Sequence, residues 1–121
     1  MAPEQRCEYR VKDLAAPLSH YTDAVAFGNL LVISGIAPLD KDGQLVGPED
    51  AVAQTRFILE CMGKILEAAG ASFADVLRVT VYLTDVADRT AINPVRQEFF
   101  GETLPASTLI GVSELAIPGM K

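Results

Sequence analysis

A long amphipathic segment runs directly into the most β-rich stretch of the chain, and this order leaves few folds open. Apolar side chains recur at three- and four-residue spacing over residues 55–69, which predicts a helix that covers a sheet. Glu49 and Asp50 stand in its expected first turn, and Gly70 is the expected residue just beyond its end. Residues 76–84 (VLRVTVYLT) are rich in β-branched and aromatic side chains and predict a central strand. The helix therefore belongs to a strand–helix–strand crossover.

Shorter patterns predict four further strands. They are expected at Cys7–Val11, where polar and apolar residues alternate, at Ala24–Phe27 and Leu30–Gly35, and at Ser107–Val112. Gly28 and Asn29 separate the second and third of these, which is a signal for a two-residue hairpin turn.

Two starting points are open for the second helix, which should end before Gly101. Asp88 or Thr90 could cap it, but Pro94 would then stand inside the helix. We therefore favour a single turn over residues 88–92, with Asn93 as the cap and Pro94 as the first helical residue, where a missing N–H is harmless.

The predicted order of elements is β, ββ, α, β, α, β within residues 1–121, which we assign to a single domain. Two helices on one face of a mixed sheet make a two-layer α+β fold. The strand over residues 76–84 carries apolar side chains on both faces, and the helices cover only one of them. An apolar sheet face without helices needs a partner chain, so we expect an obligate homo-oligomer.

Composition narrows the class of protein further. A chain of 121 residues, half of them hydrophobic, fits one globular domain, and 16 acids against 10 bases give a net charge of −6. This charge disfavours binding to nucleic acid and to anionic membranes. No apolar run reaches the roughly 18 residues that span a bilayer, and the first residues lack a signal-peptide core. We therefore expect a soluble, cytoplasmic protein.

Candidate site residues are few, because the usual motifs of nucleotide, metalloprotease and serine-hydrolase sites are absent. Cys7 and Cys61 look structural, and with His20 they are too scattered for a zinc site, so we expect no metal and no cofactor. His20 and Tyr21 lie in a loop before the hairpin, where an imidazole can move a proton and a phenol can orient a ligand. The simpler interpretation is a surface histidine beside a tyrosine packed on the sheet edge.

Other polar positions could reach a ligand, and each has an ordinary structural explanation. Ser34 and Gly35 end a strand, where a hydroxyl and bare backbone admit a small ligand, although such pairs also make plain turns. Asn93 either caps a helix or directs its amide into a pocket, and Ser107 is an ordinary strand residue unless a cleft opens beside it. Glu114 is a loop carboxylate without an evident role.

A series of short motifs, taken in order, resembles the RidA/YjgF family of small proteins from about Pro17 to Gly119. They are YTDAV (21–25), GNLLVISG (28–35), DGQLVG (42–47), QTR (54–56), LEAAG (66–70), VTVYLTD (79–85), IN (92–93) with EFFG (98–101), and PA (105–106). Each motif is short, but their order and spacing together are specific. The chain is identified as a divergent member of that family.

The resemblance implies a chorismate-mutase-like fold and a homotrimer whose sheets form a barrel-like interior with the helices outside. It also implies ligand clefts lined by two subunits. In the best-known branch of the family, these clefts hydrolyse reactive enamines and imines such as 2-aminoacrylate to a keto acid and ammonia, without a cofactor. By position, Tyr21, Ser34, Gly35 and Asn93 correspond to cleft residues of that branch.

The chain departs from that branch at several positions. An arginine that binds the substrate carboxylate is expected directly after Pro-Ala, but Ser107 stands there, and Leu109 replaces a cysteine. We therefore expect a less charged cleft that binds a small carboxylate at least about tenfold more weakly. His20 replaces a proline and could supply part of the lost polarity. Family members also continue into a final strand that carries a glutamate, and we expect that strand to be missing from the chain as given, which ends at Lys121.

We therefore predict a Rid-family hydrolase that acts on an imine or enamine other than 2-aminoacrylate, aminomuconate-type intermediates being one candidate class. Its predicted catalytic residues are His20 and Tyr21, and its predicted ligand-binding residues are Ser34, Gly35, Asn93, Ser107 and Leu109. The alternative is a non-catalytic trimer that binds a small metabolite in the same cleft. An RNA-cleaving role, sometimes attached to this family, is disfavoured by the net charge and by the lack of a basic stripe.

Overall fold

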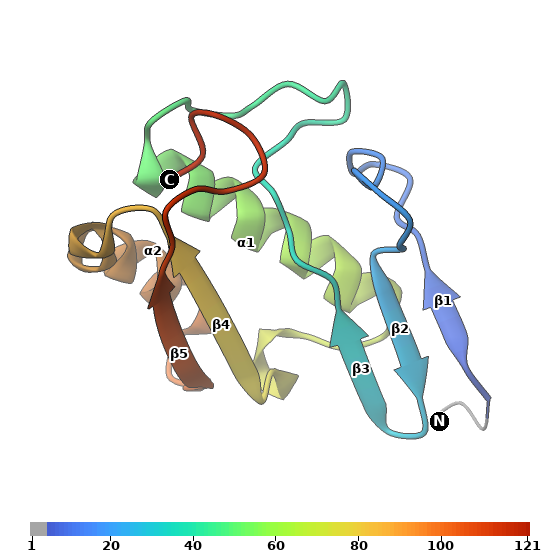
Figure 1. The fold of residues 1–121 in the computed structure, drawn as a ribbon. Helices are drawn as coiled ribbons and strands as arrows, with labels where there is room; N and C mark the ends of the chain where they lie inside the picture. The colour runs from blue at the N-terminus through green and yellow to red at the C-terminus, as the bar shows by residue number, and fades with distance from the viewer. Residues whose placement is uncertain (1–4) are drawn as a thin grey trace.

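In the computed structural model, which describes residues 5–121, the chain is an α+β fold with its helices behind two small sheets (Figure 1). One sheet is antiparallel and contains β1 (Cys7–Tyr9), β2 (Ala24–Phe27) and β3 (Leu30–Ile33) in that order. The other is a parallel pair of β4 (Arg78–Leu83) and β5 (Ala106–Gly111). The helices are α1 (Ala51–Ala68) and α2 (Arg89–Phe100), and short 3₁₀ turns at η1 (Phe73–Asp75) and η2 (Val86–Asp88) precede β4 and α2.

The prediction of an α+β fold with two helices on one side is confirmed, but the single mixed sheet is not. Antiparallel and parallel pairing are both present, yet they belong to separate sheets within residues 5–121. The parallel pair is connected through α2, because parallel neighbours need a crossover to bring the chain back to the same end. Helix α1 connects β3 to β4, as predicted, but these two strands are not hydrogen-bonded neighbours within residues 5–121.

The predicted hairpin is confirmed. β2 and β3 pair with Phe27 opposite Leu30, and Gly28 takes a φ of 62°, which is a conformation that glycine adopts without strain. On this hairpin, Ala24 and Ala26 point inward and are buried, whereas Phe27, Leu30 and Val32 share the opposite face and are exposed.

Helix α1 begins and ends through local capping. The Asp50 carboxylate accepts a hydrogen bond from Ala53 N at 3.0 Å, so Asp50 is the N-cap. Glu49 is outside the helix with a φ of 62°, so its predicted place in the first turn is wrong. At the other end, Gly70 has a φ of 78° and its N–H donates to Glu67 O, as predicted for the residue that terminates the helix.

The favoured start of the second helix is wrong. Helix α2 begins at Arg89, after Asp88, and it contains both Asn93 and Pro94. Two features explain the earlier start of this helix. The first is local: the Asp85 carboxylate accepts a hydrogen bond from Ala87 N and stabilises η2, which leads directly into the helix. In addition, Ile92 and Val95 are 1% and 2% exposed, and burial at this spacing outweighs the one hydrogen bond that Pro94 cannot make.

Strand β4 is not apolar on both faces. Because the strand begins at Arg78, its residues alternate: Val79, Val81 and Leu83 pack toward the helices, and Thr80 and Tyr82 lie on the exposed side. Large apolar side chains are nevertheless exposed on the sheet faces away from the helices. They are Phe27, Leu30, Val32, Tyr82 and Ile110, and we call them the outer apolar face.

A buried glutamine ties the last described residues to the start of α1. Gln54 is 4% exposed, and its Nε2 donates to Gly47 O at 2.9 Å and to Gly119 O at 2.8 Å. Its Oε1 accepts from Lys121 N at 2.7 Å, and Thr84 N donates to Lys121 O at 2.7 Å. All polar atoms of this side chain are therefore used, as the burial of an amide requires.

The two helices are joined by a bidentate ion pair on the surface. Arg56 Nη1 and Nη2 lie 2.7 and 3.0 Å from the two carboxylate oxygens of Glu98. Hydrogen bonding to Arg56 and its positive charge lower the pKa of Glu98 below its ordinary value.

This lowered pKa makes stability dependent on pH. The pair stabilises the native state above the pKa of Glu98 in the unfolded chain, and this contribution is lost as the pH falls through the lower, folded-state pKa. Thermal unfolding of Glu98→Gln should therefore show a small loss of stability near neutral pH, and this loss should disappear as the pH falls through the lowered pKa of Glu98. Glu102→Gln, at an exposed position without an ion pair to the described residues, is the control, and an equal loss in both variants would contradict the prediction.

Candidate functional site

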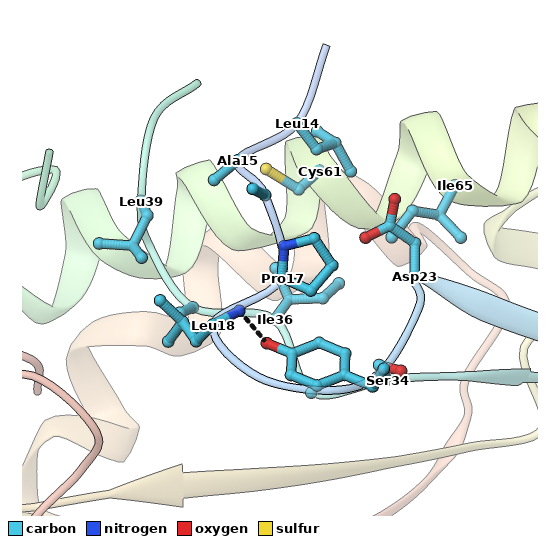
Figure 2. Close-up of a pocket in the computed structure, with 14 residues that line it drawn as sticks. Leu14, Ala15, Pro17, Leu18, Asp23, Ser34, Ile36, Leu39, Cys61 and Ile65 are labelled. Atoms are coloured by element: carbon cyan, nitrogen blue, oxygen red, sulfur yellow. Dashed lines mark hydrogen bonds between the residues drawn. The ribbon is translucent and has the colours of Figure 1, made fainter. Parts of the chain in front are cut away.

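A small pocket lies between the loop before the hairpin, the end of β3 and one side of α1 (Figure 2). Its free volume is about 50 Å³. Its walls are residues 14–18, Tyr21, Asp23, residues 34–37, Leu39, Cys61 and Ile65. Most of these side chains are apolar, and the polar atoms come from Tyr21, Asp23 and Ser34. Three of the residues predicted from the sequence, namely Tyr21, Ser34 and Gly35, are therefore neighbours around one pocket.

The Tyr21 hydroxyl is oriented by the backbone. It accepts a hydrogen bond from Leu18 N at 3.1 Å, which is drawn as a dashed line in Figure 2. Accepting this bond leaves the phenolic proton free to be donated. Tyr21 is 44% exposed, so a ligand can reach this side chain from solvent.

Ser34 and Gly35 offer different groups to a ligand. Ser34 Oγ donates to Thr22 O at 2.6 Å, so its proton is committed and its two lone pairs can only accept. Gly35 has an ordinary φ, and a Cβ built there would meet nothing within 4 Å. Each of the other eight glycines has either a positive φ or a close neighbour at that position. Nothing among residues 5–121 therefore explains a glycine at position 35.

An ion pair that sequence patterns did not reveal holds the wall of this pocket. Arg10 Nη1 lies 2.9 Å from Asp23 Oδ2, and Arg10 Nη2 donates to Leu14 O and Ala15 O, both at 3.0 Å. The same carboxylate oxygen accepts from Val11 N at 2.8 Å. These bonds fix the loop that carries the wall, and they join positions 13 residues apart, which no local motif relates.

His20 and Cys61 differ in their access to solvent. His20 is exposed on the same loop as Tyr21, but it does not line the pocket. Cys61 is buried on α1 in the pocket wall, and burial raises the pKa of its thiol. A protonated thiol is a poor nucleophile, which agrees with the structural role predicted for Cys61.

The other predicted site residues lie away from this pocket, on α2 and β5. Asn93 is exposed on α2, and Ser107 is exposed on β5. Leu109 is half-buried and packs against the core cluster of Ala51, Leu83 and Ile92. Within the chain, these residues belong to the α2–β5 unit, and Tyr21, Ser34 and Gly35 belong to the hairpin side (Figure 1).

Position 107 is not free of positive charge. Arg96, on α2, donates from Nη2 to Ser107 Oγ at 3.1 Å. A guanidinium therefore lies beside Ser107, although the residue at 107 is not itself an arginine. The prediction of a less charged cleft did not take Arg96 into account. The contact between Arg96 and Ser107 depends on how α2 packs against β5, which the sequence does not show.

Two features are absent from residues 5–121. No three His, Cys, Asp or Glu side chains of this part of the chain come together as a metal-binding group. No helix in it has the length and apolar character that crossing a bilayer demands. Glu114 is exposed and lines an open hollow of about 530 Å³, which Glu49 and Thr84 also line.

The fold and the small pocket define a class of small α+β proteins in which two helices back short antiparallel and parallel sheets. The profile of the Endoribonuclease L-PSP family matches residues 12–121. A RutC family protein of Pyrococcus horikoshii is 46% identical over 100 residues, which are 82% of this chain and 79% of that protein. The 3-aminoacrylate deaminase RutC of Acinetobacter baylyi is 43% identical over 96 residues, 79% of this chain and 76% of the enzyme.

Solved structures agree with these sequence matches. RidA from an Antarctic Psychrobacter species has a TM-score of 0.84 at 32% identity, over 92% of this chain and 89% of that one. YyfA of Yersinia pestis, a member of the conserved Rid family, has a TM-score of 0.88 at 26% identity, over 96% and 92% of the two chains. The chain therefore belongs to the Endoribonuclease L-PSP family, which is the RidA/YjgF family that its motifs resemble.

Proposed function

We propose that this protein is a hydrolase that deaminates a reactive enamine or imine in a cleft completed by a second protomer. The named activity of the RutC relative, 3-aminoacrylate deaminase, supports this reaction class. The observation that carries the proposal is the Tyr21 hydroxyl, which accepts from Leu18 N and has a free, accessible proton beside Ser34 and Gly35.

The reaction needs one water and returns one ammonia. An enamine first takes a proton on carbon and becomes an imine; water then adds to the C=N carbon, the nitrogen gains a proton, and the C–N bond breaks as the carbonyl forms. In our proposal, the Tyr21 O–H donates to the substrate or to this water, and Ser34 Oγ accepts from it. His20, exposed on the same loop, exchanges protons with solvent. None of these steps needs a cofactor.

The distribution of site residues supports assembly of the cleft from two chains. Tyr21, Ser34 and Gly35 belong to one side of the protomer, and Asn93 and Ser107 to the other. We propose that the outer apolar face is covered in a homotrimer of single-domain protomers, which brings the two groups together across the interface. The free thiols of Cys7 and Cys61 fit the cytoplasmic location that we propose.

The substrate is proposed to differ from that of the deaminating branch, because Ser107 replaces the arginine after Pro-Ala. The family description also contains the word endoribonuclease. The net charge of −6 weighs against an RNA substrate, because phosphate contacts require clustered Lys and Arg side chains.

Replacing Tyr21 with phenylalanine should lower kcat/KM for the enamine at least about tenfold, because the variant keeps the ring and loses the free proton. The assay generates enamines in place with dehydratases, larger ones as well as 2-aminoacrylate, and follows formation of the keto acid from the enamine that the wild type hydrolyses fastest. Tyr9→Phe, which removes a hydroxyl on β1 outside the pocket, is the matched control and should keep full activity. Equal rates in both variants would contradict the proposed role of the Tyr21 hydroxyl.

Ligand binding separates the two functions that the sequence left open. Saturable stabilisation of the wild type by keto acids in thermal shift, without turnover of any enamine or imine, would support the non-catalytic metabolite-binding trimer.

His20→Ala should lower the rate and leave binding of the product unchanged, because the proposed role of the imidazole is to transfer protons. An unchanged rate would mean that His20 is only a surface residue.

A further inference from the structure

The connection between β1 and β2 contains no helix or strand, and an ion pair closes it at its base. Residues 10–23 link the two strands, and Arg10 and Asp23 are the first and the last of them. Arg10 Nη1 lies 2.9 Å from Asp23 Oδ2, and the exposed fractions of the two side chains are 37% and 11%. Because the carboxylate is nearly buried, solvent and salt screen this pair less than an ion pair on an open surface.

Arg10 also holds the middle of this loop. Its Nη2 donates to Leu14 O and Ala15 O, both at 3.0 Å, and its Nη1 donates to Val11 O. In the described part of the chain, residues 12–18 form no hydrogen bond with any group outside the loop. The planar guanidinium has enough donors for one carboxylate and several carbonyls, so it fixes the polar backbone of a loop without secondary structure.

The stretch that Arg10 holds leads to the tyrosine of the candidate site. Leu18 follows Ala15 by three residues, and its N–H donates to the Tyr21 hydroxyl at 3.1 Å (Figure 2). Pro17 lies between Ala15 and Leu18, and its ring restricts the backbone. The path from the held carbonyls to the N–H that orients the phenol is therefore short and stiff.

The other end of the ion pair is connected to the serine of the site. Ser34 N donates to Asp23 O at 3.0 Å, and Ser34 Oγ donates to Thr22 O. Val11 N donates to the same Asp23 oxygen that Arg10 contacts, at 2.8 Å. The ion pair is therefore linked through hydrogen bonds to both polar side chains that the proposed reaction uses.

We infer that Arg10 and Asp23 are positioning residues, which hold the Tyr21 hydroxyl in the orientation that presents its free proton to a ligand. Arg10 does not need to touch the substrate, because its influence passes through the loop backbone to the Leu18 N–H. The effect on the reaction rests on the proposed function, whereas the effect on the orientation of Tyr21 does not.

Fluorine NMR tests the orientation of Tyr21 without turnover. The chain has three tyrosines, so protein labelled with 3-fluorotyrosine gives three signals, and Tyr21→Phe identifies the signal of Tyr21. In Arg10→Gln, we expect this signal to shift or broaden while the signal of Tyr82, on β4, stays in place. Amide hydrogen exchange at Leu18 should become at least about tenfold faster in the same variant, because its acceptor is no longer held.

A double-mutant cycle shows whether the rate follows this orientation. Arg10→Gln should lower kcat roughly 3- to 10-fold with little change in KM, because a misplaced proton donor affects the chemical step. The same substitution should change kcat less than about twofold when Tyr21 is already phenylalanine, because the hydroxyl through which Arg10 acts is then absent. Arg10→Lys should restore only part of the rate, since one ammonium cannot bind the carboxylate and the loop carbonyls together.

Arg56 provides a matched control, because it also pairs with a carboxylate, that of Glu98, but on the helices. Arg56→Gln should leave the Tyr21 signal, the exchange rate of Leu18 and kcat unchanged. Melting temperature and oligomer size are measured for every variant, and Arg10→Lys, which keeps the charge, replaces Arg10→Gln in all measurements where the latter does not fold.

The outcomes for the inference and for the proposed function are distinct. An unchanged Tyr21 signal and unchanged exchange at Leu18 in the Arg10 variant overturn the inference, whatever the wild type hydrolyses. Equal losses of kcat with and without the Tyr21 hydroxyl also overturn it and leave the hydrolase standing. If the wild type hydrolyses no enamine or imine but the Tyr21 signal moves, the positioning role stands and the hydrolase falls.

Discussion

Replacing Gln54 with leucine should lower the free energy of unfolding by about 3 kcal/mol, although the two side chains have similar volumes. The glutamine is 4% exposed and satisfies three backbone groups: Gly47 O, Gly119 O and Lys121 N. Leucine would leave all three without their partner, and each unsatisfied buried group costs roughly 1–3 kcal/mol. Water partly reaches this loop, so we expect the combined cost of the three unsatisfied groups to lie near the lower end of its range.

Urea and thermal unfolding measure this effect, which corresponds to a lower Tm on the order of 10 °C for a domain of this size. Amide hydrogen exchange at Lys121 and Gly119 should become faster in the same variant, because the loop loses its attachment to α1. Gln97→Leu is the control, since Gln97 is an exposed glutamine on α2. A Gln54 variant as stable as the Gln97 variant would show that water replaces the amide at no cost.

Replacing Gly35 with valine should reduce kcat/KM on the order of 100-fold while the protomer remains as stable as the wild type. The two halves of this expectation have different causes. Stability is retained because the φ of Gly35 is ordinary and the position of a Cβ is empty within 4 Å. Activity is lost because added methyl groups would fill the space where a ligand approaches the backbone beside Tyr21 and Ser34.

The steady-state rate, the melting temperature and the oligomer size are measured together for this variant. Ala116→Val, at an exposed alanine of the loop before Met120, controls for the addition of methyl groups at the surface. Full activity in Gly35→Val would show that no ligand comes near this backbone. A change in oligomer size without loss of binding would assign Gly35 to the subunit interface instead.

Local patterns predicted much of the fold but only part of the candidate site. The hairpin, the extent of α1 and the terminating role of Gly70 follow from hydrogen bonds between residues a few positions apart, which short motifs encode. The start of α2 was wrong because Pro94 was weighed as a local signal, while burial of Ile92 decided the outcome. Position and resemblance together identified Tyr21, Ser34 and Gly35, which surround one pocket.

The sequence by itself determined the family, the α+β class and the end of α1 at Gly70, because each depends on residue types at short, regular spacing. Only the tertiary structure decided which distant groups meet: Arg10 with Asp23, Gln54 with Gly119, and Arg96 with Ser107. These partners are separated by 13, 65 and 11 residues, and their contacts exist only after loops and helices have packed. A side chain's charge can be read from the sequence, but its partner is determined by the fold.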